Sequence, residues 1–295
     1  MFSIIIPTYN EELSLKNDNF LISLEEELKK SKFDEYEIIA VNDGSTDATL
    51  EILKGVNSDK IKILDNYINK GYGSSIKRGI INSRYDVIVI VDMDGTYPAK
   101  NVPEAIKKYF DFQSNDNNID MVVAQRTGKH YRESFIKSIL RYILRFIAQW
   151  STGNKIVDIN SGLRVFSKNT ILPFFSKLSN GFSFTTTSTL SYLLTNKSIV
   201  YFPIKYSFRK GDNNLSKVKI VRDSLRTLQY VIESTITYNP LKFFLLLSII
   251  LFLISFIFLI ISFFSKLFFA KVMFTIFLPI SILVLILGFF SVTKK

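Results

Sequence analysis

The segment DVIVIVDMDGTYP, residues 86–98, decides the fold class. Residues 87–91 form a run of β-branched apolar side chains bounded by turn signals, which is typical of a parallel strand buried on both faces. Asp92 and Asp94 follow where this strand ends. Because ligands of open α/β sheets bind outside the carboxyl ends of the strands, these two carboxylates could hold one hard cation, Mg²⁺ or Mn²⁺, and with it a diphosphate. The alternative is an ordinary Asp-Gly turn after a strand.

Three further segments predict polar groups at the same edge of the sheet. FSIIIPTYNEE, residues 2–12, is a buried strand that ends on a proline and a polar cluster. YEIIAVNDGSTDAT, residues 36–49, is a second strand that ends at Asn42 and Asp43. NKGYGSSIKRGI, residues 69–80, is a glycine-containing loop that enters a helix, an arrangement suited to phosphate or ribose contacts. Four polar strand ends in order, at regular spacing, are much less expected by chance than any one of them.

Taken together, PTYNEE, VNDGSTD, NKGYGSSIKRG and VDMDGTYP resemble, in this order, the motifs of family 2 of the inverting nucleotide-sugar glycosyltransferases. Further along, DINSGLRVF (158–166), GFSFTTTSTL (181–190) and YSFRKGDNNLSK (206–217) are similar to its dolichyl- and polyprenyl-phosphate hexose synthase branch. The resemblance covers about residues 2–240. It implies an α/β fold of the A-type nucleotide-diphospho-sugar transferases, with a mainly parallel sheet.

The resemblance also implies roles for individual residues. Asp92 and Asp94 would hold the diphosphate and its metal, and together with Arg164 they would form the catalytic group. Thr96 stands where some relatives carry a glutamine as an added metal ligand, which leaves the metal preference open. The implied donor-binding residues are Pro7, Tyr9, Glu11, Asp43, Gly71, Lys77 and Asp92, with Asp43 on the nucleotide base, and the implied acceptor-binding residues are Arg126, Ser161 and Arg164.

Two C-terminal segments predict a membrane protein. Residues 243–265 and 272–293 contain no charged side chain, and each is long enough to cross a hydrocarbon core that needs about 20 residues. Lys242 and the basic stretch before it, together with Lys294 and Lys295, place most positive charge on one side of these spans. The positive-inside rule therefore predicts a cytoplasmic catalytic domain, although two lysines in the connecting loop weaken this signal slightly.

The charge of the chain is polarised. Residues 1–128 contain 15 Lys and Arg against 21 Asp and Glu, whereas residues 129–295 contain 22 against 5. A basic half next to the spans indicates attraction to anionic lipid and to a phosphate-bearing acceptor. Nucleic acid is not an expected partner, because the positive charge lies beside the spans and no nucleic-acid motif is present. Residues 131–150 predict a basic amphipathic helix in the headgroup plane, the alternative being a core-packed surface helix.

The sequence thus predicts three parts: a glycosyltransferase domain at 1–210, a basic juxtamembrane helix region at 211–240 and a hairpin of two transmembrane helices at 241–295. The predicted reaction moves a hexose, with inversion, from a nucleotide sugar to a polyprenyl phosphate such as dolichyl or undecaprenyl phosphate. One alternative is transfer to a hydroxyl of a glycan or glycolipid, and the other is a catalytically inactive membrane scaffold. A homo-oligomer is left open.

The predicted acceptor removes the need for a side-chain general base. A hydroxyl acceptor must lose a proton as it attacks, whereas a phosphate monoester with a second pKa near ~6 is already largely dianionic at neutral pH. None of the ten residues 181–190 is acidic. Asp158 is the main rival, and we expect it to position Arg164 or a backbone turn instead.

Overall fold

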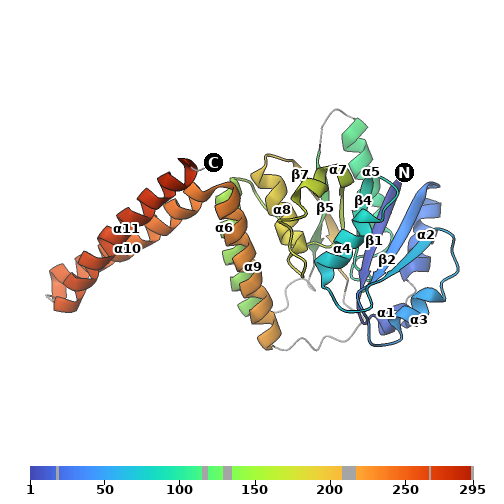
Figure 1. Ribbon diagram of the computed structural model, residues 1–295, viewed down its shortest axis with the longest axis horizontal. Coiled ribbons are helices and arrows are strands. Elements are labelled where there is room, and N and C mark those ends of the chain that lie inside the picture. The colour runs from blue at the N-terminus through green and yellow to red at the C-terminus, as the bar shows by residue number, and fades with distance from the viewer. Residues whose placement is uncertain (18–19, 115–118, 129–134, 208–216, 266, 294–295) are drawn as a thin grey trace.

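A seven-stranded sheet forms the centre of the protein, with strands in the spatial order β3-β2-β1-β4-β6-β5-β7 (Figure 1). The computed structural model describes residues 1–17, 20–114, 119–128, 135–207, 217–265 and 267–293. In this sheet β6 pairs antiparallel with both β4 and β5, whereas the other pairings are parallel. The predicted α/β fold with a mainly parallel sheet is confirmed. The strands are β1 (Phe2–Thr8), β2 (Tyr36–Asn42), β3 (Ile61–Asp65), β4 (Val87–Ile90), β5 (Met121–Thr127), β6 (Arg164–Ser167) and β7 (Ile199–Lys205).

The central strands are buried on both faces because their side chains alternate between two apolar cores. Ile4 and Ile6 of β1 pack on one side of the sheet and Ile5 on the other, as the two-residue period of a strand requires. Continuous apolar runs in the sequence follow from this double burial. The first core is covered by α1 (Glu12–Asn17), α2 (Phe20–Lys30), α3 (Thr49–Lys54) and α5 (Asn101–Ser114), and the second by α4 (Tyr72–Ile81), α7 (Lys168–Ile171), the 3-10 helix η2 (Leu172–Phe174) and α8 (Phe184–Leu194).

Two long helices, α6 (Phe135–Thr152) and α9 (Lys217–Tyr238), run side by side next to α8 (Figure 1). A third apolar core joins them, with Leu144 and Ala148 from α6, Leu190 from α8 and Val231 from α9. One side of α6 is therefore packed on the catalytic domain, as a surface helix would be. Its other side is exposed.

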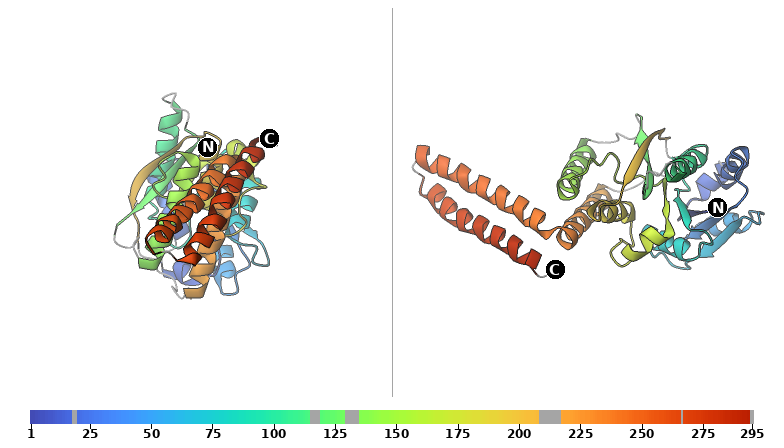
Figure 2. Two further views of the ribbon diagram at one scale, coloured as in Figure 1. Left: turned by 90° about the vertical axis from the view of Figure 1, so that its left-hand side faces the viewer. Right: turned by 90° about the horizontal axis from the view of Figure 1, so that it is seen from above.

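An apolar hairpin of α10 (Pro240–Ser265) and α11 (Phe268–Thr293) projects away from the sheet (Figure 2). Both helices are long and apolar enough to cross a membrane, with mean hydropathies of 3.3 and 2.7. Between them, the Ser248 hydroxyl donates to the Ser281 carbonyl oxygen at 2.8 Å, and Gly288 lies against Phe244. Small residues let two membrane helices approach closely. The predicted pair of long apolar C-terminal helices is confirmed.

The predicted boundary between the catalytic domain and the juxtamembrane region, at residue 210, lies outside the described residues. The next predicted boundary falls at the start of α10, which begins at Pro240. We keep the three-part division as a proposal, with α9 as the described part of the region between domain and hairpin.

Candidate functional site

The carboxyl ends of β1, β2 and β4 meet at one edge of the sheet. Parallel pairing places Thr8 beside Asn42 and Asn42 beside Asp65, so the loops that follow these strands lie next to one another. Pro7 is the penultimate residue of β1, and Tyr9 follows that strand with its side chain exposed. Glu11 is buried at the start of α1, where it accepts the Ser14 hydroxyl at 2.6 Å. The structure thus brings the predicted donor residues of the first strand to this edge.

Asp43 is buried at the end of β2 and shapes the neighbouring loop. Its Oδ1 accepts from the Asn66 side-chain amide at 2.8 Å and from the Lys70 backbone N–H at 3.0 Å. Its Oδ2 accepts from the Gly71 backbone N–H at 2.8 Å. Asp43 therefore holds the loop between β3 and α4 in place. The contact of Asp43 with a nucleotide base stays a prediction.

The start of α4 is bonded to the segment before α8. The backbone N–H groups of Gly73 and Ser74 donate to the carbonyls of Gly181 and Asn180 at 3.2 and 2.9 Å. The Lys77 ammonium donates to the Leu178 carbonyl at 2.6 Å and to the Asn180 side-chain oxygen at 2.7 Å.

The glycines of this segment permit a close chain–chain approach. A Cβ on Gly73 would lie 2.2 Å from the Ser179 carbonyl oxygen, and one on Gly71 would lie 2.6 Å from the Asn180 carbonyl oxygen. In the structure these glycines and Lys77 connect the start of α4 to the segment before α8. Their contacts with phosphate or ribose stay predictions.

Asp92 is held from two sides. Its Oδ1 accepts from the Tyr72 hydroxyl of α4 at 2.8 Å. Burial, with the negative charge of Asp92, raises the pKa of Tyr72 well above its usual value, so the phenol keeps the proton that it donates. On the other side, a Cβ on Gly162 would lie 2.2 Å from Asp92 Oδ2. Any side chain at position 162 would therefore require the Asp92 carboxylate or the turn to move.

Asp94 is oriented within its own turn. Its Oδ1 accepts from the Thr96 backbone N–H at 3.1 Å and from the Thr96 hydroxyl at 2.6 Å. Gly95 between them has a φ of 68°, a left-handed conformation that glycine adopts without a steric penalty. A cavity of about 270 Å³ lies beside this turn and is lined in part by Asp94, Tyr97 and Ser14.

The two carboxylates suit a divalent cation that is bound together with a diphosphate. Among the described residues, no group of three or more His, Cys, Asp or Glu is arranged to hold a metal. Mg²⁺ in phosphate chemistry typically takes one or two protein carboxylates and completes its shell with substrate phosphates and water. Asp92 and Asp94 match that donor set, while Thr96 orients the second carboxylate through its hydroxyl.

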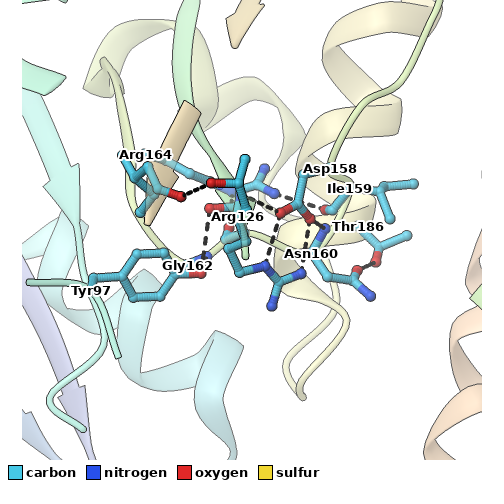
Figure 3. A network of polar contacts seen from close by, with 11 residues as sticks. Tyr97, Arg126, Asp158, Ile159, Asn160, Gly162, Arg164 and Thr186 are labelled. Atoms are coloured by element: carbon cyan, nitrogen blue, oxygen red, sulfur yellow. Dashed lines mark hydrogen bonds and ion pairs between the residues drawn. The ribbon is translucent and has the colours of Figure 1, made fainter. Parts of the chain in front are cut away.

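Arg126 and Asp158 form a bidentate, largely buried ion pair near the end of β5 (Figure 3). The guanidinium Nε and Nη2 donate to the two carboxylate oxygens at 2.8 Å each. Burial alone would raise the pKa of Asp158, but the hydrogen bonds and charge of Arg126 bring it below its ordinary value. Asp158 also accepts from the Asn160 backbone N–H at 3.2 Å. Of the two expected roles, Asp158 positions a backbone turn, and the arginine that it holds is Arg126 and not Arg164.

Arg164, the first residue of β6, is fully buried beneath the turn that carries Ser161. Its Nε donates to the Ser161 carbonyl at 2.7 Å, and its Nη2 donates to the Ile159 carbonyl at 2.8 Å (Figure 3). Its Nη1 donates to the Thr189 hydroxyl of α8 at 2.8 Å. The structure therefore shows Arg164 fixing the 159–161 turn. Direct contacts of Arg164 and Ser161 with an acceptor phosphate stay predictions.

The family model described as Glycosyl transferase family 2 matches residues 3–172. The chain belongs to this family. The family 2 chain is 28% identical over 186 residues to the dolichyl-phosphate beta-glucosyltransferase of Homo sapiens, an alignment that covers 60% of this chain and 57% of the human protein. It is 26% identical over 257 residues to the undecaprenyl-phosphate 4-deoxy-4-formamido-L-arabinose transferase of Photorhabdus laumondii, covering 84% of this chain and 70% of that protein.

Among solved structures, the family 2 chain is similar to glucosyl-3-phosphoglycerate synthase from Mycobacterium tuberculosis in complex with phosphoglyceric acid. The TM-score is 0.61, the sequence identity is 14%, and the alignment covers 80% of each chain. At this identity the likeness shows the fold alone, which is the predicted A-type glycosyltransferase fold. Other structures of that synthase contain UDP with Mn²⁺ or with Mg²⁺.

Proposed function

We propose that this family 2 chain transfers a hexose from a nucleotide sugar to a polyprenyl phosphate, with inversion at the anomeric carbon. The observation that carries the proposal is the contact of Gly162, in the turn fixed by Arg164, with the carboxylate of Asp92. This contact supports a single site for the predicted donor and acceptor groups, because Asp92 belongs to the first and the Ser161–Gly162 turn to the second. The names of the human and Photorhabdus relatives support a polyprenyl phosphate acceptor, and the hairpin of α10 and α11 supports a membrane-bound lipid substrate.

Each side of the proposed site has a chemical task. A divalent ion on Asp92 and Asp94 would neutralise the charge that develops on the departing nucleoside diphosphate. Arg126, whose side chain is 16% exposed and is held by Asp158, would orient the acceptor phosphate, since a guanidinium matches phosphate oxygens. The attacking phosphate oxygen forms the new bond to the anomeric carbon as the bond to the diphosphate breaks. No proton has to leave that oxygen when the phosphate is dianionic.

A screen of labelled nucleotide sugars with the full chain in lipid vesicles tests this proposal. Each donor is offered with a polyprenyl phosphate, with the matching polyprenol and with a glycolipid. We expect product only with the phosphate acceptor. Product with an acceptor hydroxyl would establish the first alternative, and a full screen without transfer would favour an inactive scaffold. The family to which the chain belongs and its pair of carboxylates at the sheet edge argue against the scaffold.

Asp158→Asn tests whether that carboxylate is a base. Its lowered pKa means that Asp158 is ionised throughout the neutral range, and its contribution to stability is present above about pH 4 and lost as the pH falls through the folded value. We therefore expect the kcat profile between pH 6 and 8 to keep its shape in the variant, with a loss of about 10-fold from a less firmly held Arg126. Removal of an ionisation from the profile, with a loss of ~10³-fold or more, would make Asp158 a general base.

The exposed side of α6 extends the proposed membrane contact. Tyr142, Ile143, Phe146 and Trp150 are exposed along this helix. The Trp150 indole N–H donates to the Lys242 carbonyl at 3.3 Å, and the Lys242 ammonium donates to the Ser151 carbonyl at 3.3 Å. The end of α6 is thereby tied to the start of α10. We propose that this aromatic side lies in the lipid headgroup region. The predicted basic side of the helix includes Lys137 and Arg141, whose side chains the structure does not describe.

Membrane orientation can be measured directly because the chain contains no cysteine. We propose that the catalytic domain is cytoplasmic. With an impermeant maleimide, Leu267→Cys, between α10 and α11, is expected to react in intact cells. Asn82→Cys, at the exposed end of α4, is expected to react only after permeabilisation. The reverse pattern would place the catalytic domain outside.

A further inference from the structure

Tyr97 is a buried tyrosine that connects the Asp92–Asp94 loop to the acceptor-side turn. Its hydroxyl accepts from the Gly162 backbone N–H at 2.6 Å and lies 3.4 Å from the Ser161 Oγ (Figure 3). Burial raises the pKa of Tyr97 far above its ordinary value, so the phenol keeps its proton. A protonated hydroxyl can accept from Gly162 and donate to Ser161 at the same time.

Gly162 transmits this contact to Asp92. A Cβ on Gly162 would lie 2.2 Å from Asp92 Oδ2 and 2.8 Å from Asp92 Cγ, so the glycine backbone lies directly against the carboxylate. The Tyr72 hydroxyl holds the opposite oxygen of Asp92 at 2.8 Å. One tyrosine hydroxyl thus holds the Asp92 carboxylate directly, and the other holds the Gly162 turn that lies against it.

The ring of Tyr97 packs on Tyr206, which in turn lies beside Arg126. Its centroid lies 5.4 Å from that of Tyr206, with the two rings nearly perpendicular. The Arg126 guanidinium carbon lies 5.5 Å from the centroid of Tyr206. The Tyr206 backbone N–H donates to the Thr127 carbonyl at 3.1 Å, which fixes Tyr206 beside the end of β5. Tyr97 therefore contacts the Ser161–Gly162 turn through its hydroxyl, and through its ring it contacts Tyr206, the neighbour of Arg126.

We propose that Tyr97 is a positioning residue that couples the two halves of the reaction. Its hydroxyl holds the Ser161–Gly162 turn against Asp92, and this contact keeps the Asp92 carboxylate in place for the metal-bound diphosphate. This inference rests on the proposed function, because it concerns the geometry between donor and acceptor. Removing the hydroxyl leaves the buried Gly162 N–H without its acceptor, and the turn is then free to shift away from Asp92.

Tyr97→Phe tests the inference because it keeps the ring and removes the hydroxyl. In the full chain in vesicles, we expect kcat to fall about 10- to 100-fold, the cost of a misplacement near 1 Å. The Mn²⁺ concentration that half-saturates binding of UDP, or of GDP if UDP does not bind, is expected to rise at least about fivefold. The matched control is Tyr36→Phe, since the buried hydroxyl of Tyr36 finds no hydrogen-bond partner among the described residues. That control is expected to change neither quantity.

A double variant shows whether the effect passes through Asp92. If Tyr97 and Tyr72 act on the same carboxylate, the effect of Tyr97→Phe with Tyr72→Phe should differ from the product of the single effects by at least about fivefold. A product within twofold, or an unchanged half-saturating Mn²⁺ concentration, would reduce Tyr97 to a structural role and overturn the inference. Wild-type protein that binds neither nucleoside diphosphate with Mn²⁺ would refute the proposed function together with the inference. Normal wild-type binding with an unaffected variant refutes the inference alone.

Discussion

Asp94→Ala is expected to lower transfer by at least about 10³-fold, which corresponds to roughly 4 kcal/mol of lost transition-state stabilisation. The Asp94 carboxylate accepts from the backbone N–H and the hydroxyl of Thr96, within its own turn. We therefore expect the loss of activity to come from the missing charge at the diphosphate and not from unfolding. Turnover is measured in vesicles with saturating Mn²⁺, and folding is checked by circular dichroism. A chelator should have the same effect on the wild type.

Two further variants separate charge from shape at this position. Asp94→Asn keeps an oxygen that can accept from Thr96 but removes the negative charge, and we expect it to be nearly as inactive as the alanine variant. Asp86→Asn is the control, because Asp86 lies at the opposite end of the same strand and accepts from the Ser167 hydroxyl at 2.7 Å. Its turnover should stay within about twofold of wild type, as is usual for changes away from a site. Near-wild-type turnover of Asp94→Ala would refute the metal assignment.

The parts of the fold that sequence could predict are those in which local pattern and tertiary environment agree. The apolar runs at residues 4–7 and 87–91 are continuous because β1 and β4 contact a core on each face, and a polar residue after such a run is expected at the sheet edge. That is why Asp43 and Asp92 could be placed before any coordinates were known. Periodicity supplies this information at short range.

Contacts between distant segments could not be predicted in the same way. The sequence predicts phosphate or ribose contacts for the loop with Gly71 and Gly73, and this stays a prediction. What the sequence does not show is that the Asn180 and Gly181 carbonyls lie at the start of α4. Nothing in residues 69–80 shows which carbonyl oxygens will approach. Nothing in the motif GFSFTTTSTL, residues 181–190, indicates a contact with the start of α4.

Arg164 shows the same limit for a charged residue. The resemblance implies that Arg164 belongs to the acceptor-phosphate site, and arginine is rarely fully buried unless it is paired. In the structure its donors bond to carbonyls within its own motif and to hydroxyls of α8, Ser188 and Thr189, while a direct contact with phosphate stays a prediction. The run of serines and threonines in α8 would be unusual for a buried helix unless it offered such acceptors, and that relation appears only when β6 and α8 are seen together.

Gly162→Ala is expected to lower kcat by about 100-fold or more, with the fold retained. The added methyl would lie 2.2 Å from Asp92 Oδ2 and 2.9 Å from Oδ1, so either the carboxylate or the turn has to move. Asp92 is held by the Tyr72 hydroxyl on its other side, which leaves it little room. Displacements near 1 Å at a reacting centre cost roughly 10²-fold. Turnover should fall much more than the thermal midpoint.

Gly181→Ala is the matched control for this prediction, since a Cβ there would have its nearest neighbour, the Ser179 hydroxyl oxygen, at 3.8 Å. It makes the same chemical change in a second loop of the same domain but meets only ordinary contacts, so its turnover should stay within about threefold of wild type. Binding of a nucleoside diphosphate with Mn²⁺ gives a second readout on the folded protein, and we expect Gly162→Ala to weaken it. If Gly162→Ala turns over and binds Mn²⁺ like the control, then Asp92 does not depend on this turn, and the contact between the donor and acceptor halves is not what organises the site.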